Sequence, residues 1–310
     1  IDPVLPVVNG REKPIPFDSV HSLLEYAEKE GLDLADLGLI YEKALSGLQE
    51  SDVIGKMKEL VGIIENSIDS GLAGTTYKDR ILPQQSHLVK AASKRNLILQ
   101  NSIVNQIIAN VSAIMESRPI AKKTPTNPTA GSCGAVGGVL RAVAEEVEAD
   151  PEELVKAYFA AGLVGVFFAM GPGFSAEEHG CQVECGASAG MAAAGIVQLF
   201  GGTAKQGVDA ASMAIQNMIG LVCDPIADRV EAPCLGKNVS AAVNALSSAT
   251  MSCSGFNALI PLEEVIETVS RVSKQMPTCV KCTGKGGLAI TKTALEIKER
   301  MRQSSCYKCS

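Results

Sequence analysis

Three cysteines in the second half of the chain could bind a metal. Cys181, Cys223 and Cys234 each lie next to a Gly or a Pro, or one residue away from one, where helices stop and loops begin. Loop thiols near helix ends can converge on one point, and thiolates are soft ligands that suit iron–sulfur clusters or zinc. Three thiolates on a four-iron cluster would leave one iron open, and an open iron is a Lewis acid.

The same three cysteines also allow a simpler interpretation. Their C-x41-C-x10-C spacing is not that of a standard cluster motif. Free cysteine is among the most buried residue types, so three thiols in a core of small residues would give the same pattern. The pattern alone leaves both a metal centre and a plain core open.

A second group of thiols lies near the end of the sequence. Cys279 and Cys282 form one C-x2-C pair, and Cys306 and Cys309 form another. The 23 residues between the pairs slightly exceed the usual gap of a zinc site, and a helix expected over 288–302 would connect them. A structural zinc site is one interpretation, and free thiols on a frayed tail are another.

Residues 122–138 break the rules of helix formation, because they contain two prolines and several glycines. Thr126, Asn127 and Ser132 carry short hydroxyl and amide side chains that could hold a carboxylate. The loop leads into a helix expected from about Ala135, whose first N–H groups favour an anion. An elaborate helix-capping loop would have the same composition.

Eight segments between residues 124 and 289 carry the motifs that matter most. They are Thr124–Gly131, Gly180–Glu184, Ser188–Ala194, Gln216–Met218, Leu221–Pro225, Val230–Cys234, Lys237–Asn238 and Thr283–Ala289. Together, and in this order, they resemble the α chain of the iron–sulfur-dependent bacterial L-serine dehydratases. In that family the cysteines matching Cys181, Cys223 and Cys234 hold a [4Fe-4S] cluster, and the α part is helical.

The resemblance implies a reaction and a set of substrate contacts. The reaction would be α,β-elimination of water from L-serine, followed by hydrolysis to pyruvate and ammonia. The open iron would bind the β-hydroxyl and make hydroxide a better leaving group. Thr126, Asn127, Ser132 and Asn238 are the expected substrate-binding residues.

The group that accepts the Cα proton is the least defined part of this prediction. His179 adjoins the first cysteine, and Lys285 lies in a Gly-flanked run that suits an anion ligand. We take both as candidate catalytic residues. Glu184, Asp224 and Glu231 are alternatives, or they orient the metal ligands.

Three further alternatives stay open. Some relatives use a C-terminal cysteine to block the open iron at rest, so Cys306 or Cys309 could act in this way. The surroundings of Cys181 depart from the small residues usual there, so threonine or cysteine could replace serine as substrate. A non-catalytic helical iron or zinc protein would instead have four protein ligands and no open iron.

The composition favours an all-α fold of Ala- and Gly-rich packed helices, with the site at helix ends and loops. The 310 residues are 46% hydrophobic and contain no Trp, which suits close-packed helices better than a β-sandwich. We expect one catalytic domain. Its parts are an arm (1–16), N-terminal helices (17–118), a cluster- and substrate-binding core (119–290) and a C-terminal helix with a Cys-containing tail (291–310).

Apolar periodicity and helix-stop residues predict where the helices lie. The expected ranges are 20–30, 34–48, 52–68, 97–115, about 135 onward, 157–170, 187–199, 208–220, 239–251 and 288–302.

Charge and hydropathy exclude some partners. The net charge is −6 and no Lys/Arg block is present, so nucleic-acid binding is not expected. The longest apolar run, 157–170, is too short to cross a bilayer, so no membrane is expected either. Ten cysteines without a signal peptide fit a reducing cytoplasm. The family resemblance implies a separate β subunit and an oligomeric assembly.

Overall fold

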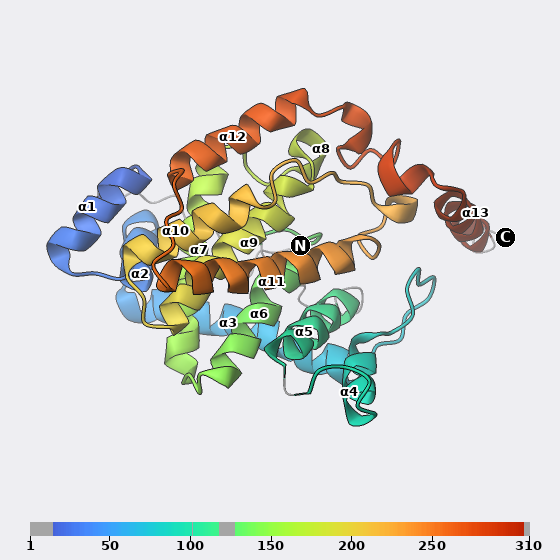
Figure 1. The fold of residues 1–310 in the computed structure, drawn as a ribbon, viewed down its shortest axis with the longest axis horizontal. Helices are drawn as coiled ribbons and strands as arrows, with labels where there is room; N and C mark the ends of the chain where they lie inside the picture. Colours follow the sequence, from blue (N-terminus) through green and yellow to red (C-terminus); the bar gives the residue numbers. More distant parts are fainter. Residues whose placement is uncertain (1–14, 101, 118–127, 307–310) are drawn as a thin grey trace.

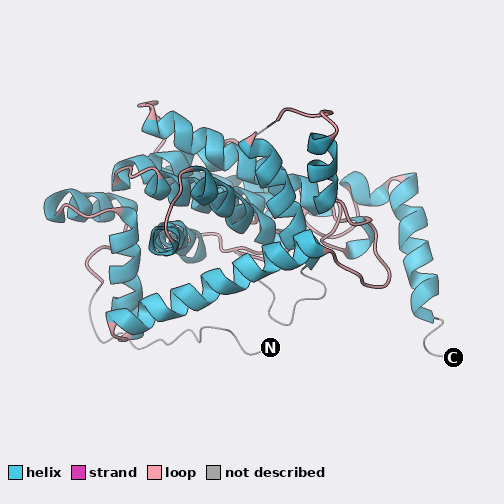
Figure 2. Cartoon of the chain, turned by 90° about the horizontal axis from the view of Figure 1, so that it is seen from below, coloured by secondary structure: helices cyan, strands magenta, loops and turns pink. Residues whose placement is uncertain are grey.

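The computed structural model describes residues 15–100, 102–117 and 128–306, which form a helical molecule (Figure 1, Figure 2). In these ranges the only β-type pairing is one isolated bridge, so the prediction of an all-α fold is confirmed. The α-helices are α1 (Val20–Glu30), α2 (Leu34–Ser46), α3 (Glu50–Ala73), α4 (Ser86–Lys94), α5 (Ile103–Ser117), α6 (Cys133–Glu146), α7 (Pro151–Met170), α8 (Ala176–His179), α9 (Cys185–Leu199), α10 (Ala204–Gln216), α11 (Cys234–Cys253), α12 (Leu262–Gln275) and α13 (Lys292–Cys306).

Four helices begin with a capping box, which explains where they start. Ser19, Asp33, Asp150 and Thr203 each accept a hydrogen bond from the backbone N–H three residues later. The side chain of that third residue accepts one in return from the cap's backbone N–H. This pairing satisfies N–H groups that the first turn of a helix leaves without partners.

Helix α9 lies in the middle of the packed helices and contacts α6, α7, α10 and α11 (Figure 1). Its residues from Cys185 to Val197 are small or aliphatic and all buried. A Cβ atom added to Gly195 would lie only 2.9 Å from the carbonyl oxygen of Ala157 in α7. The small residues therefore let neighbouring backbones approach closely, as the composition predicted.

Helix α7 is longer than the apolar run that the sequence suggested, because it begins at Pro151 rather than near Ala157. Within the described residues it is the one helix long and apolar enough to cross a membrane. More than half of that window is buried inside the molecule, against α2 and α9. We interpret α7 as a core helix.

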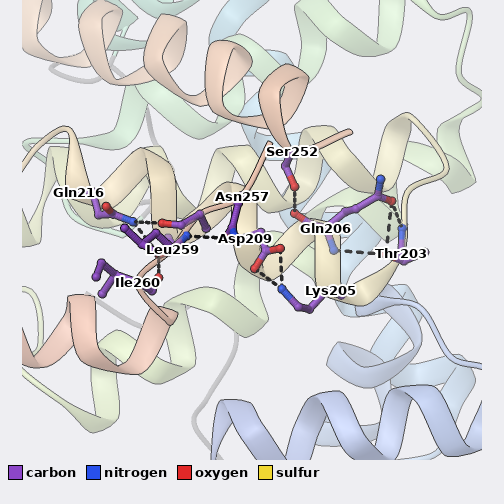
Figure 3. A network of polar contacts seen from close by, with 11 residues as sticks. Thr203, Lys205, Gln206, Asp209, Gln216, Ser252, Asn257, Leu259 and Ile260 are labelled. Atoms are coloured by element: carbon purple, nitrogen blue, oxygen red, sulfur yellow. Dashed lines mark hydrogen bonds and ion pairs between the residues drawn. The ribbon is translucent and has the colours of Figure 1, made fainter. Parts of the chain in front are cut away.

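A polar network holds the end of α11 and the segment before α12 against α10 (Figure 3). Ser252 donates a hydrogen bond of 2.8 Å to the carbonyl oxygen of Gln206. Gln216 donates to the carbonyl oxygen of Ala258 at 3.1 Å. These contacts fix the entry of α12, which in turn packs against the short α8 beside the first site cysteine.

Several expectations about helix bounds were wrong. Helices α10, α11 and α13 begin at Ala204, Cys234 and Lys292 rather than near 208, 239 and 288. Helix α3 runs on to Ala73 instead of ending near 68, since Gly71 packs in the helix against Ala113 of α5. Helix α5 begins at Ile103 rather than near 97. No helix was predicted over α12, although its buried apolar residues have helical spacing. They are Leu262, Val265, Ile266 and Val269.

Candidate active site

Cys181 begins a 3-10 turn directly after Gly180. Gly180 has φ +75°, and a Cβ there would lie 2.8 Å from Met276 Cε and 3.0 Å from the carbonyl oxygen of Leu221. Only glycine combines this left-handed backbone with so close an approach. Gln182 strengthens the turn by donating to the His179 carbonyl and accepting from Gly220 N–H.

Cys223 lies in an extended segment that pairs with the residues after α12. Its N–H donates to the carbonyl oxygen of Val280 at 2.8 Å, and its carbonyl accepts from the N–H of Cys282 at 2.8 Å. These bonds form a parallel bridge between Cys223 and Lys281. The third predicted ligand, Cys234, is the first residue of α11 and is buried.

The thiols form a contact chain. Cys181 Sγ lies 3.4 Å from Cys185 Sγ at the start of α9, and it also shares a hydrogen bond with the thiol of Cys223. Cys223 shares another with the thiol of Cys282. The fold therefore brings together side chains that are up to 101 residues apart in sequence (282 − 181).

The surroundings of Cys181 favour a thiolate. Hydrogen bonds with Cys185 and Cys223 lower the pKa of Cys181 well below its ordinary value, and the charge of Lys237 acts in the same direction. The Lys237 ammonium donates to Asp224 Oδ1 at 2.7 Å and to the carbonyl oxygen of Val222 at 2.6 Å. A half-buried cation is thus fixed beside the thiols.

Glu184 connects the thiols to the loop before α6. Its Oε1 accepts a hydrogen bond of 2.6 Å from Thr129 Oγ1, and its Oε2 lies 3.8 Å from Cys181 Sγ. Burial raises the pKa of Glu184 to about 7, and the nearby Cys181 adds to the rise. Ser132 Oγ lies 3.1 Å from Thr129 Oγ1, so the two hydroxyl groups form one chain ending at this carboxyl group.

Asn238 joins the same loop to the helix of Cys234. Its Oδ1 accepts from the N–H groups of Gly134 and Ala135 at 3.0 and 3.1 Å. Its Nδ2 donates to the carbonyl oxygens of Gly131 and Cys234, both at 2.8 Å. The side chain is fully buried. The first N–H groups of α6, which we expected to hold an anion, are therefore occupied by Asn238.

Two other candidate carboxylates are also held by neighbouring groups. Asp224 accepts from Lys237 and, through Oδ2, from the N–H of Leu288 at 2.8 Å. Glu231 Oε2 accepts from the N–H groups of Ile81 and Leu82 at 2.8 and 3.2 Å. Of the three candidate carboxylates, Glu184 is the one that contacts Cys181.

The two candidate catalytic residues differ in their environment. His179 is half-buried, its Nδ1 is buried without a hydrogen-bond partner, and its Nε2 lies 3.6 Å from Glu178. Lys285 is exposed, in the segment that follows Cys282. Thr126 and Asn127 lie outside the described residues.

The two cysteines of the first C-x2-C pair differ in exposure. Cys279 is exposed, whereas Cys282 is half-buried and contacts Cys223. The two thiols of this pair therefore have different surroundings. Cys306 ends α13, and Cys309 lies outside the described residues.

Sequence reasoning missed two parts of this site. Thr129 was quoted within a motif but not proposed as a functional residue, although its hydroxyl binds Glu184. Cys282 was assigned to the C-terminal thiols rather than to the site of Cys223. The Gly-rich run after Cys282 could have indicated that this segment packs closely against the site.

The residues present fit a metal site with several thiol ligands. The thiols are buried or half-buried, none of those described is in a disulfide, and a lysine offsets thiolate charge. Among the residues that the structure describes, no three His, Cys, Asp or Glu groups converge on one ion. Paired thiols spread along a chain suit a multi-iron cluster better than a single zinc ion.

Comparison with known proteins identifies relatives of this chain. A Bacillus subtilis (strain 168) protein described as "Probable L-serine dehydratase, alpha chain" is 32% identical over 285 residues, covering 92% of this chain and 95% of its own length. The L-serine dehydratase alpha chain of Peptoniphilus asaccharolyticus is 31% identical, covering 91% and 97%. L-serine dehydratase 1 of Escherichia coli (strain K12) is 32% identical over 89% of this chain but only 62% of its own length.

The family model described as "Serine dehydratase alpha chain" matches residues 27–289. That range includes Thr129, Glu184, Asn238 and the thiols of the contact chain. The chain therefore belongs to the serine dehydratase alpha chain family.

Proposed function

We propose that this chain is the catalytic part of an L-serine ammonia-lyase that converts L-serine to pyruvate and ammonia. The observation that carries the proposal is the grouping of Cys181 and Cys223 thiols, with Cys234 at an adjoining helix start, in a member of this family. We further propose that these three cysteines hold a [4Fe-4S] cluster. When bound, such a cluster with one open iron supplies Lewis acidity toward the β-hydroxyl of serine.

The residues around the thiols have separate roles in this proposal. Glu184 accepts the Cα proton, because its carboxyl group lies beside Cys181 and is oriented by Thr129. The Thr129–Ser132 hydroxyl pair contributes polar contacts for the substrate. Lys237 offsets the negative charge of thiolates and substrate carboxylate. Loss of the proton and of hydroxide gives 2-aminoacrylate, which tautomerises and hydrolyses to pyruvate and ammonia.

Glu184 is a better candidate for the acceptor of the Cα proton than the other charged residues nearby. Asp224 and Glu231 already accept hydrogen bonds from backbone N–H groups. Lys285 is exposed. His179, with an unpartnered Nδ1, is the second candidate, and Glu184→Gln compared with His179→Gln separates the two. The variant that loses turnover while keeping its iron identifies the acceptor.

An anaerobic reconstitution tests the activity. The chain is loaded with iron and sulfide, and iron content, electron paramagnetic resonance and pyruvate release from L-serine are recorded. We expect about four irons per chain and serine-dependent pyruvate, both lost in Cys181→Ser, Cys223→Ser and Cys234→Ser. Cys253→Ser, at the other end of α11 from Cys234, is the matched control and retains both. Zinc without iron, and no pyruvate, contradicts the proposal.

We also propose a separate β subunit. The relatives that match over nearly their whole length are described as alpha chains, whereas the Escherichia coli relative is a longer chain. Co-expression with a candidate β chain should give a stable complex with higher turnover than this chain alone. Full activity of the isolated monomer contradicts this part. The predicted cytoplasmic location rests on the need for reduced thiols.

A further inference from the structure

The segment that follows α12, residues 277–290, forms one wall of the thiol site. The bridge between Cys223 and Lys281 fixes this segment through two backbone hydrogen bonds of 2.8 Å. A third attachment follows at Leu288, whose N–H donates to Asp224. The segment is thus held by residues directly beside a predicted metal ligand, at both ends of its Gly-rich run.

The glycines of this wall pack closely against the site. A Cβ added to Gly287 would lie 2.6 Å from Asp224 Oδ2, and Gly287 has φ +59°. A Cβ added to Gly286 would lie 2.7 Å from the carbonyl oxygen of Cys279. The Gly-rich run is therefore folded tightly onto the site and onto itself.

Cys282 is the one residue of this wall whose thiol reaches the other thiols. Its side chain shares a hydrogen bond with Cys223. Its backbone adopts φ +57°, a left-handed conformation that is unfavourable for a non-glycine residue. Cys279, three residues earlier on the same wall, is exposed. The strained backbone at Cys282 is held by the bridge hydrogen bonds, one of which its own N–H donates to the carbonyl oxygen of Cys223.

We propose that Cys282 is a fourth thiol ligand of the cluster, bound to the iron that Cys181, Cys223 and Cys234 leave open. This inference rests on the proposed function, because it presumes the cluster. Cys282 then occupies the position that the substrate needs, so its thiol competes with L-serine for this iron. The ligand comes from the wall after α12 and not from the tail residues 307–310.

The experiment uses the reconstituted full-length chain and three single variants. Cys282→Ser removes the proposed ligand, Cys279→Ser is the matched control on the same wall, and Cys309→Ser removes the tail thiol. Circular dichroism first establishes that each variant folds. Each cluster is then treated with ferricyanide under argon, and the rate of conversion to a three-iron cluster is followed by electron paramagnetic resonance. An iron without a cysteine ligand is the one lost in this oxidation.

We expect conversion of Cys282→Ser to be at least about tenfold faster than that of the wild type, corresponding to 1.4 kcal/mol or more. Cys279→Ser and Cys309→Ser should behave as the wild type does. If the wild type converts as fast as Cys282→Ser, or if Cys309→Ser alone shows the acceleration, the inference is overturned. Absence of iron in every sample, wild type included, would instead refute the proposed function.

A second readout needs no cluster. In the metal-free chain, mild oxidation with diamide should yield a peptide cross-linked between Cys223 and Cys282, detectable by mass spectrometry after digestion. Cys279→Ser should leave the yield unchanged. If Cys223 cross-links only to other cysteines, Cys282 is not at the site and the inference fails.

Discussion

Opposing interactions set the pKa of Glu184. Burial and the neighbouring Cys181 disfavour its charge and raise its pKa to about 7, while the hydrogen bond from Thr129 stabilises the carboxylate. A carboxyl group in this state can both accept and return a proton near neutral pH. Its position three residues after Cys181 keeps this function next to the thiols.

We expect Glu184→Gln to lower kcat by about 10²- to 10⁴-fold, the usual contribution of a positioned proton acceptor. Gln keeps the size and the contact with Thr129, so the iron content should not change. Initial rates of pyruvate release, normalised to iron, measure the effect. Glu264→Gln, an exposed change on α12, serves as control and should leave kcat unaltered. Equal rates for Glu184→Gln and the wild type would exclude the role.

Asn238 illustrates how a positioning side chain differs from a ligand-binding one. All four of its hydrogen bonds go to backbone groups, on both the loop before α6 and the first turn of α11. The prediction that it contacts substrate remains untested. Its contacts indicate that it sets the distance between Ser132 and Cys234.

Asn238→Ala should destabilise the fold by about 2–4 kcal/mol, because buried N–H and C=O groups lose their partners. Thermal or urea unfolding followed by circular dichroism measures this change. Asn217→Ala removes an exposed amide that contacts Asn244, and it should cost less than about 0.5 kcal/mol. Comparable losses for the two variants would show that the buried bonds contribute little.

At this scale the sequence predicted residue types better than residue roles. Cysteines beside Gly and Pro identified the metal-binding candidates without any structure. The partners of Asn238 could not be predicted, because Gly134 and Ala135 lie more than 100 residues away in the chain. The same holds for Cys282, whose relation to Cys223 depends on a bridge formed only after α12 has turned back.

The helices were predictable where local signals agree with packing. Helix α1 was predicted with its observed bounds, since Ser19 and Gly31 mark its ends. Helix α3 was predicted too short, because its glycine at 71 is used for contact with α5 rather than for a stop. Tertiary packing decides which of these two uses a glycine has.

The glycines inside α7 and α9 give a direct test of this difference. A Cβ on Gly162 of α7 would meet nothing within 4 Å, so Gly162→Ala should stabilise the fold by about 0.5–1 kcal/mol. A Cβ on Gly195 of α9 would meet the Ala157 carbonyl oxygen and Leu140, so Gly195→Ala should destabilise it by about 1–3 kcal/mol. Urea midpoints of the two variants should move in opposite directions. Movement in the same direction would contradict close packing of α9 against α7.

For the whole molecule, the all-α fold was predictable from composition because Ala- and Gly-rich helices pack without aromatic residues. The arrangement in space was not. Helices α1 and α13 lie at opposite ends of the long axis, while the site is assembled near α8, α11 and the wall after α12 (Figure 1). Many contacts that assemble the site, such as those of Glu184 with Thr129 and of Cys223 with Cys282, join distant segments, which sequence periodicity does not report.

Cluster binding should stabilise the whole molecule, because only the folded chain brings the thiols together. A ligand present at 100 times its Kd adds about 2.7 kcal/mol of stability. The reconstituted chain should therefore unfold at a higher temperature than the metal-free chain, by calorimetry under argon. Cys223→Ser should abolish this difference, and Cys253→Ser should keep it. Identical Tm values with and without iron in the wild type would contradict a cluster in the folded core.

The wall that carries Cys282 also sets an order of events during synthesis. Cys282 leaves the ribosome 101 residues after Cys181 (282 − 181). At roughly 5–20 residues per second, the first thiol exists for about 5–20 s before that wall has been made. During this interval the hydrogen bonds from residues 280–288 to Cys223 and Asp224 cannot form, so the thiol site lacks this wall. If the proposed cluster were inserted only after folding, the hydrogen bonds that hold this segment to Cys223 and Asp224 would have to break first.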